Sequence, residues 1–484
     1  MTSLAAQLGR IVGDAHVIAR ATQLLVYRSD ALPGLQRAPA RAVFPGTRDE
    51  LIEVVRVLAA AGAPFVSRGA GTGLSGGALA DDITLLGLHR LKRILALDPI
   101  ARTATVEPGV VNAALTRAGA PHRLHYAPDP SSQTACTIGG NIAENAGGPH
   151  CLKYGVTLDH AIRATVVLPS GEVVILDRGD VARDDGTQGG YDLLGAFVGS
   201  EGCFGVVVDV TVRLTPDPER VCTLLADFTR VRDAADATSR IIAAGIMPAA
   251  LELMDQPTIE AVESSVYAAG YPRDAAAVLL IEVDGAAAGL DDDVWAVERL
   301  CRAAGARTVR VAHDAAERAR LWLGRKKAFG AMGRVAPHLV VQDAVVPRSM
   351  LAELLDDIAA IGDRHRVRIC NVFHAGDGNL HPNIPYNAHN ADESARVHAA
   401  MTEIMTRCIA AGGTITGEHG VGLDKLPYME QLFTADTLDA MCSLRAVFDP
   451  ERRANPGKVV PVRACREWHG VASTRHGARA GETR

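Results

Sequence analysis

The amino-acid sequence predicts an α+β protein that is divided into more than one domain. Its 484 residues exceed the size, roughly 250–300 residues, at which a single hydrophobic core stops growing. Helical and strand-like patterns alternate along the chain, with turn-rich segments of small residues between them. The composition, 48% hydrophobic and 22% charged, is that of an ordinary soluble globular protein. Such a chain can bury a large cofactor.

Hydrophobic spacing and turn residues place the first elements. Residues 47–63 carry apolar side chains at helical intervals, with Thr47 as the N-cap residue and Glu50 three positions later. A short strand is expected at 64–67, directly before a glycine-rich loop. Further strands are expected at 83–88, 104–108, 163–168, 172–176 and within 199–214. These elements predict an α+β unit that ends near residue 218.

The remainder of the chain continues the alternation. Strands are expected at 277–283 and 367–373, and a helix near 434–447. The last residues are rich in Arg, Gly, Ser and Thr, and we expect them to be disordered. The chain is predicted to divide into an N-terminal helical segment (1–40), a first domain (41–218) and a second domain (219–410). A C-terminal helical segment (411–462) and a disordered tail (463–484) follow.

Composition excludes several classes of function. The net charge is −6, and there is neither a basic stripe nor a set of aromatic residues for base stacking, so nucleic-acid binding is not expected. The nine cysteines are scattered without any C-x-x-C pair, which argues against an iron–sulfur cluster or a thiolate zinc site. The N-terminus has charged residues where a signal peptide has its apolar region, and no run approaches the ~18 apolar residues of a membrane span. We expect a cytoplasmic protein with at most peripheral membrane contact through partners.

The glycine-rich loop at residues 68–77 reads RGAGTGLSGG and points to a bound phosphate group. Gly71, Gly73 and Gly76 satisfy G-x-G-x-x-G, but a Rossmann turn must open a helix, and the residues after Gly76 start a helix poorly. A loop of bare main-chain N–H groups can instead cradle a pyrophosphate without a helix. The alternative is a flexible glycine hairpin with no ligand.

A second motif, residues 374–383, reads HAGDGNLHPN. His374 and His381 flank a Gly-Asp-Gly-Asn turn, so a strand, a reversal and a return strand can bring both imidazoles to one side. Glu418 and His419 stand between glycines in a second loop. Two histidines and one carboxylate are a common ligand set for a divalent metal. The alternative is that both histidines are hydrogen-bonded structural residues.

Three blocks in order, at 64–77, 128–148 and 199–210, resemble the FAD-binding domain of the vanillyl-alcohol oxidase and p-cresol methylhydroxylase type. The resemblance implies two α/β subdomains that bind FAD, then an α+β substrate (cap) domain and a C-terminal segment that returns to the flavin. In that family the first block wraps the pyrophosphate, the second lines the flavin and the third leads to a strand beside the adenine. Some members bond FAD through a histidine in the first loop; Ala70 and its neighbours here include none, which implies non-covalent FAD.

Carried over position by position, the resemblance implies a set of cofactor-binding residues in these blocks and in the segment 455–458. They are Arg68, Gly69, Ala70, Gly71, Thr72, Gly73, Leu74, Pro128, Asp129, Thr134, Thr137, Gly139, Gly140, Asn141, Asn145, Gly147, Glu201, Gly205, Val206, Val208 and Asn455.

The second motif is similar to that of the family's 2-hydroxy-acid dehydrogenases. This likeness implies that His374, His381 and Glu418 bind a divalent metal, zinc or another first-row ion. It also implies that His419 is the general base and that Asn383 orients the substrate oxygen. The base would take the hydroxyl proton while hydride passes from Cα to the flavin.

An acid substrate needs a cation, and the resemblance points to Arg325, whose guanidinium can hold a carboxylate by two hydrogen bonds. The alternative is a solvated helix face shared with Lys326 and Lys327. Family members that act on longer dicarboxylates have polar residues where this chain has Ala328, Phe329, Val340 and Val341. The apolar positions favour a small monocarboxylate, glycolate or D-lactate.

Within the family, the segments 127–133, 147–155, 268–272 and 371–379 most resemble the catalytic subunits of glycolate oxidases, which work with a second FAD-domain subunit and an iron–sulfur subunit. The absence of cluster cysteines in this chain agrees with that division of labour. A stand-alone D-lactate or D-2-hydroxyglutarate dehydrogenase remains an alternative. A metal-dependent hydrolase is a further alternative if the flavin assignment fails, as is a flavoprotein with only a structural role.

Overall fold

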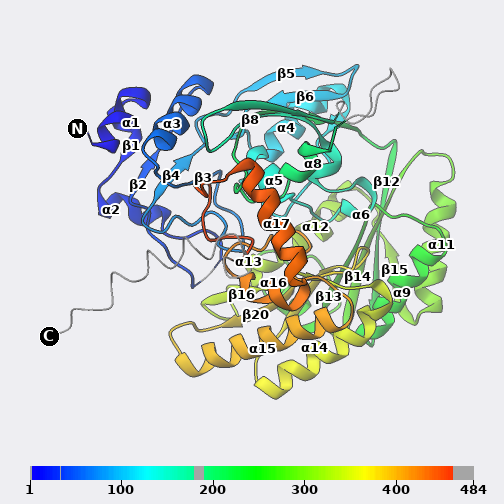
Figure 1. Cartoon of the computed structure of the whole chain (residues 1–484). Helices are drawn as coiled ribbons and strands as arrows, with labels where there is room; N and C mark the ends of the chain where they lie inside the picture. Colours follow the sequence, from blue (N-terminus) through cyan, green and yellow to red (C-terminus); the bar gives the residue numbers. More distant parts are fainter. Residues whose placement is uncertain (1–2, 33, 179–189, 462–484) are drawn as a thin grey trace.

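The computed structural model describes residues 3–32, 34–178 and 190–461 (Figure 1). It combines helices and strands in two parts. In Figure 1 the N-terminal strands and helices form the upper part, and a large sheet with its helices forms the lower part. The tail at 463–484, expected to be disordered, lies outside the described residues. No described helix is long and apolar enough to cross a membrane.

A four-stranded sheet carries the glycine-rich loop. Its strand order is β1-β2-β4-β3, with β2 and β3 both parallel to β4. Helix α3 (Arg48–Ala60) connects β2 to β3, and the Thr47 side chain accepts the Glu50 N–H at 3.2 Å as the predicted N-cap. The strands are β1 (Val17–Ile18), β2 (Arg41–Val43), β3 (Phe65–Arg68) and β4 (Thr84–Gly87). The strands expected at 64–67 and 83–88 are therefore present, and the loop leaves the carboxyl end of β3.

A five-stranded antiparallel sheet lies beside the first. Its order is β5 (Ile94–Asp98), β6 (Thr103–Val106), β10 (Val206–Arg213), β8 (Ala161–Val167) and β9 (Val173–Asp177). The edge strand β5 was not expected from the sequence, because its mostly unburied residues lack strand alternation. Within the turn-rich segment 128–148 the chain forms α5 (Ile138–Glu144), whose start is capped by the Thr137 side chain. Its two glycines hide this helix from propensity arguments.

The third sheet is the largest. Its main path is β15 (Ala306–Val311), β12 (Arg220–Phe228), β14 (Ala277–Gly285), β13 (Ala250–Asp255), β18 (Cys370–His374), β19 (Asn379–Leu380) and β17 (Ala344–Val345). The strand β20 (Pro382–Tyr386) branches from β18 and pairs with β16 (His338–Val341). The strands expected at 277–283 and 367–373 correspond to β14 and β18.

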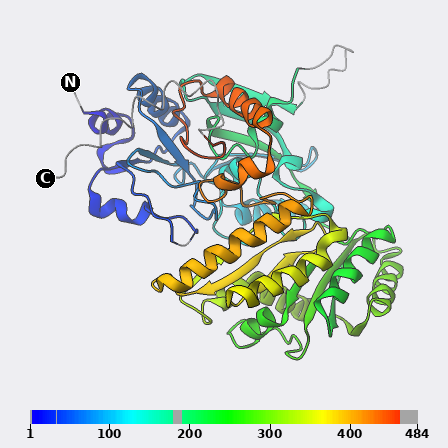
Figure 2. The same cartoon turned by 60° about the horizontal axis from the view of Figure 1, so that its bottom comes forward.

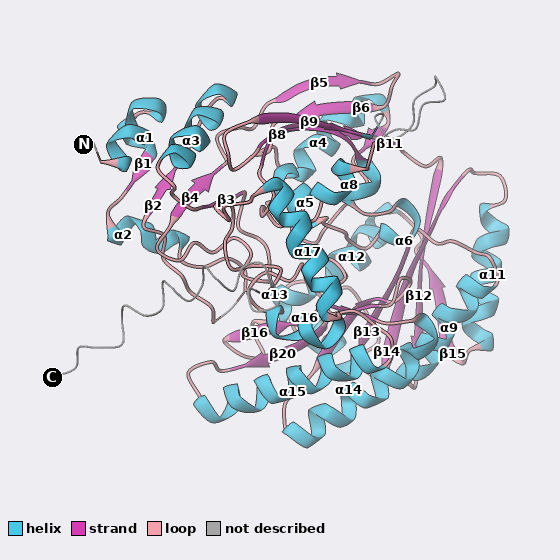
Figure 3. Ribbon diagram, viewed as in Figure 1, coloured by secondary structure: helices cyan, strands magenta, loops and turns pink. Residues whose placement is uncertain are grey.

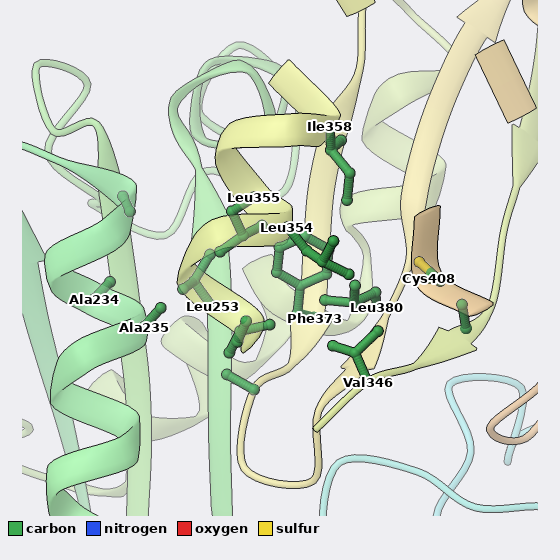
Figure 4. Packing of buried hydrophobic residues seen from close by; sticks show 14 of the residues in the cluster. Ala234, Ala235, Leu253, Val346, Leu354, Leu355, Ile358, Phe373, Leu380 and Cys408 are labelled. Carbon is green, nitrogen blue, oxygen red and sulfur yellow. The ribbon is translucent and has the colours of Figure 1, made fainter. Parts of the chain in front are cut away.

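Helices cover one face of this sheet. Four of them are α9 (Val231–Ala243), α11 (Leu290–Ala303), α14 (Leu351–His365) and α15 (Ala391–Ala410). Helices α14 and α15 lie side by side across the sheet (Figure 2). Leu354 and Leu355 of α14 pack toward Phe373 of β18 and Leu380 of β19 (Figure 4). This packing fixes the positions of β18 and β19, on either side of the His374 turn.

The remaining elements are short or connect these layers (Figure 3). The helices are α1 (Leu4–Val12), α2 (Ala21–Leu24), α4 (Asn112–Gly119), α6 (Cys151–Tyr154), α7 (Thr157–His160), α8 (Leu193–Phe197), α10 (Gln256–Glu263), α12 (Ala315–Lys326), α13 (Ala328–Met332) and α16 (Leu426–Leu432). Strands β7 (Leu124–His125) and β11 (Thr215–Pro216) form a separate pair.

The C-terminal segment returns to the first sheet. After α17 (Ala435–Phe448), which confirms the helix expected near 434–447, the Phe65 N–H donates to the Arg453 carbonyl at 2.8 Å. The Asn455 N–H donates to the Phe65 carbonyl at 2.8 Å, and Lys458 Nζ donates to the Gly77 carbonyl at 2.7 Å. The end of the described chain is therefore fastened to β3 and to the glycine-rich loop.

Candidate functional site

One cavity of about 600 Å³ brings together segments from both parts of the fold. Its size is within the range of small-molecule and cofactor sites. The glycine-rich loop, α5, the segment from Lys326 to Val341 and the histidine cluster all contribute to its walls. The residues predicted separately from the glycine motif and from the histidine motif thus line a single cavity.

Most of the predicted cofactor-binding residues line this cavity. They are Arg68, Gly69, Ala70, Gly71, Thr72, Gly73, Leu74, Thr137, Gly139, Gly140, Asn141, Gly147 and Glu201. Gly71 has a φ of +70°, and a Cβ at Gly69 would lie 2.4 Å from the Thr137 hydroxyl oxygen. Glycine is thus needed in the loop both for its conformation and where it meets the cap of α5.

The other predicted cofactor-binding residues do not line the cavity. Thr134 lines a neighbouring cavity, and Asp129 pairs with His150 and Lys326. The remaining ones occupy structural positions around the binding segments, namely Pro128, Asn145, Gly205, Val206, Val208 and Asn455. Val206 and Val208 pack in the core of the first sheet.

Asn145 and Asn455 hold the binding segments in place. Asn145 ends α5 in the left-handed conformation, and its side chain accepts the Leu158 N–H. Asn455 donates to the carbonyls of Gly77 and Glu201 at 3.0 and 2.6 Å. It therefore joins the C-terminal segment to the first and third blocks of the FAD-type motif.

His374 and His381 face each other as the turn between them predicted. His374 is the last residue of β18 and pairs with Asn379 across the turn. The centroids of the His374 and His381 rings are 5.1 Å apart. The carboxylate of Glu418 reaches both rings, with Oε1 at 3.4 Å from His374 Nε2 and 3.3 Å from His381 Nε2. One ligand atom from each of the three residues lies within 4.8 Å of the other two.

In both His374 and His381 the Nδ1 atom is held by a hydrogen-bond acceptor. His381 Nδ1 is 3.1 Å from the Gln342 carbonyl oxygen, and His374 Nδ1 is 2.8 Å from a carboxylate oxygen of Glu252. Because both partners only accept hydrogen bonds, each Nδ1 carries the hydrogen. The Nε2 atoms of both rings face the Glu418 carboxylate, and His381 Nε2 is buried without a hydrogen-bond partner among the described residues. This donor set suits a divalent cation.

The electrostatics of the cluster fit a site for positive charge. Burial alone would raise the pKa of Glu418, but His374 and His381 outweigh it and hold that pKa well below its usual value. Burial alone would lower the pKa of His374, yet Glu252 and Glu418 raise it well above its usual value. A positive charge between these residues, whether proton or metal, is therefore stabilised.

Asp343 organises the loop that carries Glu418 and His419. Its buried carboxylate accepts the main-chain N–H groups of Gly417 at 2.9 Å and His419 at 3.0 Å, and Lys425 Nζ donates to it at 3.0 Å. Thr416 donates its hydroxyl hydrogen at 2.7 Å. Asp343 thus fixes a loop without regular secondary structure against the third sheet.

His419 lies against His381, with ring centroids 4.9 Å apart and ring planes within 10° of parallel. Burial lowers the pKa of His419 to about 4, although the charge of Asp343 opposes the shift. The imidazole is therefore neutral near pH 7 and able to accept a proton.

The structure places Arg325 behind His374 and outside the lining of the cavity. Its side chain is 1% exposed, and Nη2 is 2.5 Å from Glu252 Oε2, the carboxylate that also holds His374. The alternative of a solvated helix face is therefore wrong for Arg325. Its Nε and Nη1 atoms are buried without a hydrogen-bond partner among the described residues.

Asn383 also lies next to the cluster and outside the cavity lining. It is fully buried on β20, and its Nδ2 donates to the His381 carbonyl at 2.6 Å. Its Oδ1 has no hydrogen-bond partner among the described residues. In this arrangement Asn383 supports the position of His381.

Sequence reasoning missed four charged residues that shape the site: Asp343, Glu252, Lys425 and Glu144. Glu252 lies on β13, whose register with β18 places it opposite His374. Glu144 lines the cavity, and burial together with the charge of Glu201 raises its pKa well above the usual value. A carboxylate inside an otherwise buried strand, as at Glu252, is the one signal that could have been used.

Comparisons with known proteins agree with the arrangement. A profile described as "FAD binding domain" matches residues 39–177, and one described as "FAD linked oxidases, C-terminal domain" matches residues 217–459. The chain is 42% identical over 478 residues to "Glycolate oxidase subunit GlcD" of Escherichia coli (strain K12), covering 98% of this chain and 94% of that protein. It is 31% identical over 432 residues to "D-lactate dehydrogenase" of Anaerostipes hadrus, covering 87% and 89%.

The fold has a counterpart among solved structures. It is similar to p-cresol methylhydroxylase with substrate bound, with a TM-score of 0.79 and 16% sequence identity, covering 94% of this chain and 96% of the other. The predicted fold class, with an FAD-binding domain of this type and an α+β domain after it, is confirmed. The chain belongs to the family of FAD-linked oxidases, with an FAD-binding domain followed by the family's C-terminal domain.

Proposed function

We propose that this chain oxidises a small 2-hydroxy acid, glycolate or D-lactate, to the 2-oxo acid, with non-covalent FAD as the electron acceptor. The observation that carries the proposal is that the glycine-rich loop of the FAD-binding domain and the cluster of His374, His381, Glu418 and His419 line the same cavity. Cofactor and acid–base groups can then meet one small substrate.

The chain's own residues account for the proton. Bound FAD would supply the acceptor for the hydride from Cα, and a bound divalent metal would supply the charge that lowers the pKa of the substrate hydroxyl. Neutral His419 accepts the hydroxyl proton as the C–O single bond becomes a carbonyl. A hydride, which is one proton with two electrons, leaves Cα, and one proton leaves the hydroxyl oxygen. The products are therefore the 2-oxo acid, reduced flavin and a protonated base.

We propose that His374, His381 and Glu418 hold the divalent metal, zinc or another first-row ion. The support is that Glu252 and Gln342 hold the two rings through Nδ1, so that both Nε2 atoms face one carboxylate. Nitrogen ligands and a carboxylate with room for substrate are typical of catalytic zinc sites.

Arg325 remains our proposed partner for the substrate carboxylate, and Asn383 for the substrate oxygen. Arg325 uses one of its nitrogens on Glu252 and keeps Nε and Nη1 free of protein partners among the described residues. Arg325 Nη2 lies 3.5 Å from His374 Nδ1, so a carboxylate bound to this guanidinium would place Cα near the proposed metal ligands.

The cavity lining favours a small substrate. Phe329, Leu339 and Val341 line it, whereas Ala328 is buried and Val340 lines another cavity on the opposite side of β16. A second carboxylate, as in D-2-hydroxyglutarate, would meet apolar side chains at those three positions and lose its hydration. The alternative of a metal-dependent hydrolase required that the flavin assignment fail, whereas the chain belongs to the FAD-linked oxidases.

We also propose that electrons leave reduced FAD for partner subunits, one with a second FAD domain and one with an iron–sulfur cluster. The relative named as a glycolate oxidase subunit supports an assembly. We propose a cytoplasmic location, with any membrane contact made through those partners.

Dye-coupled turnover on glycolate, D-lactate, L-lactate and D-2-hydroxyglutarate tests the proposal. We expect kcat/KM to be highest for glycolate or D-lactate. Turnover of none of the four acids by protein that contains FAD would refute the proposed activity. A preference for D-2-hydroxyglutarate would refute the argument from Phe329 and Val341.

A further inference from the structure

A second cavity, of about 390 Å³, adjoins the first. The two share three lining residues, Ser131, Lys326 and Lys327. Its other walls come from α12, from the segment 133–134 and from His150. Several of these residues are exposed, including Ala315, Ala319 and Thr134. This second, outer cavity therefore borders the cavity of the histidine cluster at Lys326 and Lys327.

The outer cavity carries an excess of cations. His150, Arg318, Lys326 and Lys327 line it. Their carboxylate partners are two: Asp129 accepts from His150 and Lys326 at 3.0 Å each, and Glu282 accepts from Arg318 at 2.8 Å and lies 3.3 Å from His150 Nε2. With His150 protonated, four positive charges face two negative ones. The net positive charge of the outer cavity attracts anions.

Lys327 is the cation of this set that the protein leaves unused. His150, Arg318 and Lys326 are each held by a carboxylate, whereas the Lys327 ammonium group makes no ion pair or hydrogen bond with any described residue. It is exposed and lines both cavities, directly after the end of α12. An ammonium group at the junction of two cavities can bind a carboxylate without first breaking an internal pair.

We propose that the outer cavity is the antechamber through which the substrate carboxylate reaches the flavin cavity, with Lys327 as the cation that receives it. The inference rests on the proposed function only in that the substrate is an acid. Lys327 is thus a positioning residue that acts on association and leaves the chemical step unchanged. A charge at the rim of a site changes the association rate and its salt dependence more than the chemistry.

The first test measures association of oxalate, an unreactive carboxylate, with the FAD-loaded protein by stopped-flow flavin absorbance at several ionic strengths. We expect Lys327→Gln to slow association about 3- to 10-fold at low salt and to flatten its salt dependence, an effect in the lower part of the range for electrostatic steering. The matched control is Lys92→Gln, which removes the same charge from an exposed position that lines neither cavity. If the two variants behave alike, or if oxalate does not bind to the wild-type protein, the proposal is wrong.

The second test obstructs the route without changing charge. Ala319→Trp fills the outer cavity from an exposed helix position, and Ala316→Trp adds the same side chain to an exposed position of α12 that does not line it. We expect Ala319→Trp to slow oxalate association and dissociation by similar factors and to leave Kd nearly unchanged, as narrowing a passage must. Equal rates in the two variants would contradict the proposal.

Steady-state turnover separates this inference from the proposed function. If the wild-type protein oxidises none of the four acids, the proposed function fails, while the oxalate rates still decide whether the antechamber exists. If it does oxidise them, Lys327→Gln should lower kcat/KM at low salt about as much as it slows oxalate, with kcat within about twofold of wild type. A fall in kcat alone would place Lys327 in the chemical step and contradict its role in association.

Discussion

The carboxylate of Asp343 accepts the main-chain N–H of His419 at 3.0 Å, and this contact ties the proposed base to the third sheet. The same carboxylate binds Lys425 Nζ at 3.0 Å, and both side chains are buried. Replacement by asparagine keeps the shape but removes the charge. We expect Asp343→Asn to lower the free energy of unfolding by about 3–5 kcal/mol, since it leaves Lys425 buried without its counter-charge.

Denaturant unfolding and dye-coupled turnover check this expectation. Turnover should fall more than tenfold because Glu418 and His419 lose their fixed position. Asp81→Asn is the control, since Asp81 makes an exposed ion pair with Arg37 and its loss should cost less than about 1 kcal/mol. Full activity in Asp343→Asn would contradict the role that we assign to this carboxylate.

His419 should be required for turnover and not for flavin binding. We expect His419→Gln to reduce kcat about 10²- to 10⁴-fold, the usual contribution of a general base, while the protein keeps its FAD. His122→Gln, an exposed histidine outside the cavity, is the matched control and should retain wild-type kcat. A His419→Gln enzyme with normal kcat would show that another group takes the proton.

Removal of the proposed metal should abolish activity reversibly. We expect the purified protein to contain one divalent ion per chain by elemental analysis, and chelation to remove both the ion and the turnover. Readdition of one type of ion should restore turnover. His381→Ala should lose the ion, because its Nε2 faces Glu418, whereas His389→Ala, an exposed histidine, should keep it. Chelation that changes neither metal content nor activity would refute the ligand set.

The glycine-rich loop permits a direct test of cofactor contact. A Cβ at Gly73 would meet no atom of the described part of the chain within 4 Å, and Gly73 lines the cavity. Gly73→Leu should therefore leave the stability of the apoprotein unchanged and weaken FAD binding more than tenfold, because its side chain enters the cofactor space. Fluorescence titration of the apoprotein with FAD measures the affinity.

Gly190 supplies the control, since a Cβ there also meets no atom of the described residues within 4 Å and the residue is exposed outside the cavity. Gly190→Leu should bind FAD as the wild type does. Equal FAD affinities for the two variants would mean that the loop does not contact the cofactor.

The ion pairs of His150 predict a pH dependence of stability. Burial would lower the pKa of His150, but Asp129 and Glu282 outweigh it and raise the pKa to about 10. Because the folded-state pKa lies above the unfolded value of about 6.5, the stabilisation is fully present below pH ~6.5 and is lost as the pH rises through about 10. His150→Gln should therefore destabilise the protein at pH 6 by a few kcal/mol, roughly the effect of breaking a buried ion pair.

Unfolding of wild type and variant between pH 6 and pH 10 measures this difference. We expect it to shrink steadily as the pH rises. His125→Gln, which breaks a pair with the 40%-exposed Asp217, should show a much smaller difference at every pH. A difference for His150→Gln that is constant across the range would mean that the histidine is not charged in the folded protein.

The sequence by itself determined the local features of this protein. Thr47 and Glu50 marked the start of α3, the glycines of 68–77 marked a loop of exposed amides, and the Gly-Asp-Gly-Asn turn placed His374 and His381 on one side. Each of these depends on residues within about ten positions of one another, where spacing and turn chemistry act directly. The ordered blocks then indicated the FAD-linked fold.

Only the tertiary structure decided how these pieces meet. Glu252 lies opposite His374 because β13 pairs with β18, although the two residues are more than a hundred positions apart. Asp343 reaches the loop of His419 only because that loop packs against the end of the third sheet, and Lys327 stands between two cavities only because α12 ends there. Such contacts depend on strand register and on packing between distant segments. Local residue patterns encode neither strand register nor packing between distant segments, because both are selected by the burial of apolar surface across the whole chain.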